Sequence, residues 1–163
     1  MSIRVRLATQ GDLTEVERLS DDVQALHAAW KPDIFRASAD VPGRRAFFEN
    51  ARRDANWRVW VCGEQNTLCA YALTELFAKG GPIRKTYTEG HLHQICVQSE
   101  HRRNGIGRWL VLHVLSDLRA SGADRITVTR WTANDASALF FRSMGFVDET
   151  VTAVHRPARG PRD

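Results

Sequence analysis

The 163-residue sequence contains no long hydrophobic run, whereas a membrane-spanning helix needs about 18 consecutive apolar residues. The N-terminal stretch MSIRVRLATQGD also lacks the apolar core of a secretory signal. Cysteine is scarce, and Cys62, Cys69 and Cys96 stand in apolar runs without the spacing of a metal site or a disulfide framework. We therefore expect a soluble, cytoplasmic protein without a membrane partner or a bound metal.

A large excess of charge of one sign is also missing, since 23 Lys and Arg residues stand against 19 Asp and Glu residues. A net charge of +4 is weak support for a nucleic-acid partner, and the aromatic residues fall in apolar-periodic positions rather than in basic stretches. We expect no nucleic-acid partner. The hydrophobic content of 43% is ample for one core, which predicts a single domain over 1–155 and a flexible tail over 156–163.

Hydrophobic periodicity predicts the elements, with alternation indicating strands and spacings of three and four indicating helices. The expected strands are 3–8, 58–62, 68–77, 89–97 and 126–130, with a final strand or strand pair in FVDETVTAV, and the expected helices are 13–29, 46–51, 105–120 and 136–144. We expect a turn at 64–66 and a flexible link in KGGPIRK, 79–85. This order predicts an α/β fold with a mixed sheet and helices on both faces.

The stretch HRRNGIGRWL, residues 101–110, stands between an expected strand and an expected helix. The N–H groups at a helix start have no internal partner and lie at the positive end of the helix dipole, so anions bind there favourably. Gly105 and Gly107 would let a ligand approach the main chain, and arginines would add donors. The alternative is a tight connection in which glycine only relieves crowding.

Two nucleotide-binding motifs are excluded by their spacing. A Walker loop requires Lys and then Ser or Thr after its last glycine, but Arg108 and Trp109 follow Gly107 here. The dinucleotide fingerprint requires three glycines near an N-terminal strand, and this turn has two.

The turn resembles the acyl-CoA motif of the GCN5-related N-acetyltransferase family, which is Arg or Gln, two residues, Gly, one residue, Gly or Ala. The residues RRNGIG at 102–107 match each defined position. ICV at 95–97 is similar to the family's fourth strand, and NDASALFFRSMGF at 134–146 is similar to its second signature. The order of the other elements also agrees, so the resemblance covers nearly the whole chain.

The resemblance implies a mostly antiparallel mixed sheet that splays between its fourth and fifth strands, with acetyl-CoA as co-substrate lying in the gap. The pantetheine arm would bond to the main chain of the fourth strand, and the pyrophosphate would lie on the glycine turn. The cofactor-binding residues implied in this way are Ile95, Cys96, Val97, Arg102, Arg103, Asn104, Gly105, Ile106, Gly107, Arg108, Asn134 and Phe141.

Acetyl transfer to an amine requires removal of a proton from an ammonium. Family members commonly use a glutamate of the fourth strand, at positions occupied here by His93 and His91, which we expect to share a face with Ile95 and Val97. Histidine titrates near neutral pH and suits this role. The alternatives are an exposed or structurally bonded histidine and a His-x-His metal pair, while Glu89 is the reserve candidate for the base.

The second signature departs from the family at Phe141, where many members have a tyrosine thought to protonate the departing thiolate. Phenylalanine cannot donate a proton. Water, Tyr71 or Tyr87 would then serve, or the thiolate would leave unaided.

The acceptor region of the family corresponds to the first two helices, which carry aromatic and acidic residues. These are Trp30, Phe35, Phe47 and Phe48, with Asp21, Asp22, Asp33 and Asp40. They could bind a cationic amine, but we interpret the aromatics as core and the acids as a solvated face.

The resemblance therefore implies an acetyl-CoA-dependent N-acetyltransferase that acts on a primary amine of a small molecule or peptide by direct attack in a ternary complex. The alternatives are a non-catalytic acyl-CoA sensor and a basic nucleic-acid-binding domain. A homodimer is possible.

Overall fold

The computed structural model describes residues 3–36, 40–64 and 67–155. The chain divides into two compact units, residues 1–129 and residues 130–163, which are described separately below. The predicted tail 156–163 and part of the predicted turn 64–66 lie outside the described residues. A single domain over 1–155 stays a prediction.

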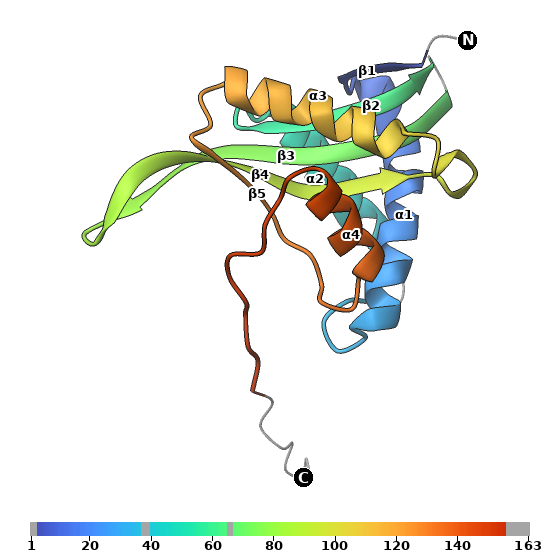
Figure 1. The fold of residues 1–163 in the computed structure, drawn as a ribbon. Coiled ribbons are helices and arrows are strands. Elements are labelled where there is room, and N and C mark those ends of the chain that lie inside the picture. The colour runs from blue at the N-terminus through green and yellow to red at the C-terminus, as the bar shows by residue number, and fades with distance from the viewer. Residues whose placement is uncertain (1–2, 37–39, 65–66, 156–163) are drawn as a thin grey trace. The chain divides into compact units, whose positions relative to one another are not determined.

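The first unit carries most of the regular structure (Figure 1). Its elements, in chain order, are β1 (Arg4–Leu7), a 3-10 helix (Gln10–Asp12), α1 (Leu13–Trp30), α2 (Val41–Arg53), β2 (Trp57–Glu64), β3 (Thr67–Gly81), β4 (Arg84–Val97), a 3-10 helix (Ser99–His101), α3 (Ile106–Ala120) and β5 (Arg125–Val128). None of the described helices is both long and apolar enough to cross a membrane.

The strands form one mixed sheet in the order β1-β2-β3-β4-β5. The first four strands pair antiparallel, and β4 and β5 pair parallel. Helices α1 and α2 cover one face of this sheet and α3 covers the other (Figure 1). The predicted α/β fold class, with a mixed sheet between helices, is confirmed.

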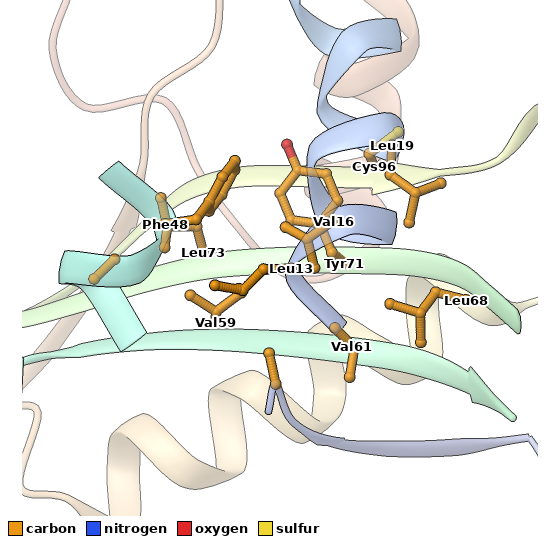
Figure 2. Packing of buried hydrophobic residues seen from close by; sticks show 12 residues of the cluster. Leu13, Val16, Leu19, Phe48, Val59, Val61, Leu68, Tyr71, Leu73 and Cys96 are labelled. Atoms are coloured by element: carbon orange, nitrogen blue, oxygen red, sulfur yellow. The ribbon is translucent and has the colours of Figure 1, made fainter. Parts of the chain in front are cut away.

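The main core lies between the sheet and the helices α1 and α2 (Figure 2). Alternation along β2 explains how both faces are covered. Val59 and Val61 point into this core, whereas the ring of Trp60 lies 5.1 Å from that of His113 on α3. Tyr71 of β3 is fully buried in the same core, with Phe48 edge-on at 5.9 Å.

The prediction of a flexible link at 79–85 is wrong, because β3 and β4 continue through it as a long hairpin arm (Figure 1). Lys79 pairs with Tyr87 and Gly81 with Arg84. The glycines and the proline thus lie at the tip of a hairpin, where the ladder of backbone hydrogen bonds is interrupted only briefly.

The register between β3 and β4 is interrupted at His93. Leu73 pairs with Gln94 and Thr74 pairs with Leu92, so His93 is an extra residue in a β-bulge. Such a bulge re-aims the side chains of the strand on either side of it.

This bulge separates the two histidines from the residues that follow them. His91 pairs with Glu75, on the sheet face that carries α1 and α2, whereas Ile95 and Val97 pair with residues of the opposite alternation on β3. The predicted shared face of His91, His93, Ile95 and Val97 is therefore wrong, since one inserted residue inverts the period-2 pattern.

The second unit contains α4 (Asp135–Ser143). The predicted strand or strand pair at 146–154 is wrong, because this segment carries no strand. Instead, Asp148 accepts hydrogen bonds from Arg130 at 2.9 Å and from Arg142 at 2.8 Å. An alternating pattern alone forms no strand, because the backbone also needs a partner ladder.

Candidate active site

The glycine turn lies between β4 and α3. After Val97 comes the 3-10 helix Ser99–His101, and Gly105 is the N-cap of α3 with a φ of 79°. Arg103 also has a positive φ, 60°. Both residues therefore have a left-handed backbone conformation, which glycine adopts without strain.

The start of α3 fits an anionic ligand. The first N–H groups of an α-helix have no intrahelical acceptor, and a Cβ added to Gly105 would meet no heavy atom within 4 Å. Arg103 and Asn104 are exposed beside it, and Arg102 donates from Nε to the carbonyl of Val97 at 2.8 Å. The turn is therefore open to solvent and fixed to the strand that precedes it.

Strands β4 and β5 part before the glycine turn. Their last pair is Leu92 with Val128, and β4 continues alone to Val97 on that edge. Residues Ile95 to Val97 pair with β3 on the other edge. Burial raises the pKa of the Cys96 thiol to about 11, so this thiol is neutral and any role of Cys96 toward a ligand falls to its main chain.

Glu89 is a buried ion-pair partner. The residue is 3% exposed, and its Oε1 accepts from Lys79 Nζ at 2.8 Å and from Thr127 Oγ1 at 2.8 Å. Burial acts to raise the pKa of Glu89, but the hydrogen bonds from Lys79 and Thr127 outweigh it, and the pKa is lowered. Glu89 is thus a carboxylate whose oxygens are already engaged.

Both ring nitrogens of His91 lie near threonine hydroxyls. Its Nδ1 lies 2.7 Å from Thr127 Oγ1, and its Nε2 lies 3.5 Å from Thr129 Oγ1. Burial, and next the proximity of His93, lower the pKa of His91. A neutral imidazole at pH 7 can accept a proton.

His93 lies against both a carboxylate and an aromatic ring. Its Nε2 is 2.9 Å from Glu75 Oε2, and its ring stacks on Trp57 at 4.6 Å. The rings of His91 and His93 are 4.5 Å apart. The structure thus brings the three predicted base candidates into one cluster. The metal alternative finds no support among the described residues, where no group of three or more His, Cys, Asp or Glu side chains could hold an ion.

A cavity of about 340 Å³ opens between α1 and α2 in the first unit. It is lined by Ser20, Val23, Gln24, His27, Ile34, Phe35, Arg36, Asp40, Arg44, Phe47, Phe48 and Gln94. The interpretation of the aromatics as core holds for Phe48, which is 1% exposed, but Phe47 is 42% exposed at the cavity. Gln94 of β4 forms part of the wall and accepts a hydrogen bond from Tyr71 at 2.8 Å.

Asn134 and Phe141 both belong to the second unit. Asn134 caps α4, accepting from the Ser137 N–H at 3.0 Å. Phe141 packs edge-on against Phe140 and Phe146, with ring centroids 5.1 and 5.3 Å away. Their predicted role at the cofactor stays a prediction.

The two tyrosines considered as proton donors already have acceptors. Tyr71 donates to Gln94 inside the core, where burial raises its pKa, and the Tyr87 hydroxyl lies 3.4 Å from Glu89 Oε2. Neither hydroxyl is available without breaking its hydrogen bond.

Fold and site together define a class of α/β proteins in which an open helix start capped by glycine lies beside two strands that part. A family model described as the acetyltransferase (GNAT) family matches residues 23–146. The chain belongs to this family, and the resemblance inferred from the glycine turn is confirmed.

Two curated relatives are acetyltransferases. The mycothiol acetyltransferase of Thermobispora bispora is 33% identical over 139 residues, covering 78% of this chain and 45% of the relative, so this chain spans less than half of that protein. The ribosomal protein bS18-alanine N-acetyltransferase of Salmonella typhimurium is 26% identical over 140 residues, covering 85% of this chain and 86% of the relative.

Solved structures show the same fold. A mutant of the BH1408 protein from Bacillus halodurans has a TM-score of 0.88 at 26% identity, covering 94% of this chain and 99% of that chain. The aminoglycoside N-acetyltransferase AAC(6')-Iy, solved in complex with CoA, has a TM-score of 0.78 at 12% identity and covers 97% and 96% of the two chains.

Sequence reasoning missed Glu75, Gln94 and Thr127. Gln94 and Thr127 stand in expected strands as ordinary polar residues, and nothing in their spacing predicts a partner. Their contacts depend on which strands are neighbours and on the bulge at His93, and neither is visible in the sequence.

Proposed function

We propose that this chain transfers the acetyl group of acetyl-CoA to a primary amine. The observation that carries the proposal is the open, left-handed Gly105 at the start of α3, next to the edge of β4 that β5 leaves unpaired. Family membership and the two acetyltransferase relatives support it.

The proposed acetyl-CoA site uses main chain more than side chains. The N–H groups of Gly105, Ile106 and Gly107 would hold the pyrophosphate, and exposed Arg103 would add charge. Residues Ile95 to Val97 would bind the pantetheine arm along their free strand edge. Bound there, acetyl-CoA supplies the acetyl group as a thioester.

The proposed proton acceptor is an imidazole of β4. Glu89 is an unsuitable base because its carboxylate is buried and neutralised by Lys79 at 2.8 Å. His91, with a lowered pKa, is neutral at pH 7 and suited to deprotonate the substrate ammonium. The resulting neutral amine would then attack the thioester. His93 lies against it and is the second candidate.

The proposed acceptor site is the cavity between α1 and α2. Its volume of about 340 Å³ falls in the range of small-ligand pockets. Phe35 and Phe47 offer aromatic faces to an ammonium, and Asp40 offers a carboxylate. Arg44 also lines this cavity, and its guanidinium is paired with Asp21.

Labelled acetyl transfer tests the function. The protein is incubated with acetyl-labelled acetyl-CoA and a panel of primary amines that includes a peptide with an N-terminal alanine and an aminoglycoside. We expect label on at least one amine, with release of free CoA in equal amount. If calorimetry shows CoA binding but no amine is acetylated, the proposal is contradicted and an acyl-CoA sensor is favoured. The absence of a tyrosine at Phe141 supports that alternative.

A further inference from the structure

A chain of hydrogen bonds leads from Glu89 through Thr127 to His91. Thr127 Oγ1 lies 2.8 Å from Glu89 Oε1 and 2.7 Å from His91 Nδ1. A hydroxyl has one proton to donate, and an ionised carboxylate can only accept. Because Lys79 Nζ lies 2.8 Å from the same Oε1, Glu89 is held ionised, and Thr127 must donate to it.

The direction of the first hydrogen bond determines the second. Once Thr127 has donated its proton to Glu89, its oxygen can only accept from His91, so Nδ1 of His91 must carry a hydrogen. A neutral imidazole with hydrogen on Nδ1 has its lone pair on Nε2. The pair Glu89 and Thr127 therefore selects one tautomer of His91.

The second ring nitrogen of His91 lies where the two strands part. Its Nε2 is 3.5 Å from Thr129 Oγ1, and Thr129 follows directly after Val128, which forms the last pair of β5 with Leu92 of β4. The lone pair thus lies at the start of the gap in which the proposed function places the thioester, whereas the hydrogen on Nδ1 faces the buried carboxylate.

We infer that Thr127 is a positioning residue that, with Glu89, fixes the Nδ1–H tautomer of His91 and so makes Nε2 of His91 the proton acceptor for the amine. This inference rests on the proposed function and deepens it. The step moves one proton from the substrate ammonium to Nε2, leaving a neutral amine and an imidazolium.

The charges around the imidazolium come from two strands. Glu89 Oε1, 4.0 Å from Nδ1, and Glu75 stabilise the positive charge, whereas Lys79 opposes it and His93 opposes it when protonated. From the chain around β5, the uncharged hydroxyls of Thr127 and Thr129 face His91.

Nitrogen-15 NMR of the imidazole rings reads the tautomer without any need for activity. His91 is assigned by comparison with His91→Gln, and spectra at pH 7.5 are then recorded for the wild-type protein, Thr127→Val and Thr127→Ser. Thr129→Val is the matched control, because it removes the hydroxyl near Nε2 of His91 but leaves the Nδ1 contact with Thr127 intact.

We expect the Nδ1–H tautomer in the wild-type protein, in Thr127→Ser and in Thr129→Val, and its loss in Thr127→Val. Once an acceptor amine has been identified, Thr127→Val should lower kcat about tenfold with the KM for acetyl-CoA unchanged. Thr127→Ser, which keeps the hydroxyl, should restore kcat. An Nε2–H tautomer in the wild-type protein, or full kcat in Thr127→Val, would overturn the inference. Absence of transfer to any amine together with the Nδ1–H tautomer would instead refute the proposed function and leave the tautomer assignment standing.

Discussion

At the scale of single residues, burial separates groups that look equivalent in the sequence. Glu89, His91 and His93 are three titratable side chains at every second position of one strand. In the structure Glu89 is 3% exposed and paired with Lys79, while the histidines lie nearer the solvent. The carboxylate is therefore already engaged, and an imidazole is the group that we propose as the proton acceptor.

His91→Ala should lower kcat about 100-fold while leaving the KM for acetyl-CoA nearly unchanged, because the variant removes the base but not the cofactor site. His113→Ala on α3 is the control, since His113 contacts Trp60 on the opposite face of the sheet. Steady-state kinetics with a saturating acceptor measures both. Equal rates for the two variants would exclude His91 as the base.

In the plot of kcat against pH, the decrease on the acid side, here called the acid limb, should be shifted to low pH. The pKa of His91 is lowered by burial and then by His93, so the neutral base persists below the ordinary histidine value of about 6.5. The rate falls only as the pH drops through this lowered pKa. In His93→Ala one lowering cause is absent, so the limb of kcat should move to higher pH; an unchanged limb would contradict the coupling.

At the scale of elements, the start of α3 is the feature on which the proposed cofactor binding depends. Gly105→Glu should weaken acetyl-CoA binding by at least about tenfold relative to Gly105→Gln, measured by calorimetry. Both variants have the same size and suffer the same strain at a φ of 79°, so their difference isolates the negative charge beside the phosphates.

Salt provides the check on this charge effect. The difference in acetyl-CoA affinity between the two variants should decrease at 1 M salt, where charges are screened over about 3 Å. Identical affinities of Gly105→Glu and Gly105→Gln at low salt would place the phosphates elsewhere.

At the scale of the whole molecule, an ion pair with a buried carboxylate joins β1 to the 3-10 helix that precedes α1. Asp12 is 8% exposed and accepts from Arg6 at 2.6 and 2.8 Å and from the Thr9 N–H at 2.7 Å. The hydrogen bond from Arg6 leads the causes that hold the pKa of Asp12 well below its usual range. A carboxyl with a depressed pKa stabilises the fold above its unfolded pKa, and the contribution is lost as the pH falls.

Asp12→Asn should therefore lower the free energy of unfolding by about 2 kcal/mol at pH 7, with the loss shrinking below about pH 4. Asp148→Asn is the matched control, because Asp148 is also paired with arginine, namely with Arg130 and Arg142, but is 51% exposed, and such surface pairs contribute less than about 1 kcal/mol. Urea unfolding at several pH values measures both. An equal loss in the two variants would mean that burial of Asp12 adds nothing.

The sequence alone determined the glycine turn, the family and the order of most elements. These follow from local requirements: RRNGIG at 102–107 has a glycine at position 105, where the backbone is left-handed, and the periodicities of 13–29 and 105–120 predict helices there.

Only the tertiary structure decided which polar groups act together. The bulge at His93 turned His91 away from the face of Ile95, and the pairing of β4 with β5 placed Thr127 against both His91 and Glu89. The physical reason is that the register between strands is fixed by contacts across the whole sheet, and a shift of one residue reverses every side chain. The periodicity of a single strand does not show that shift.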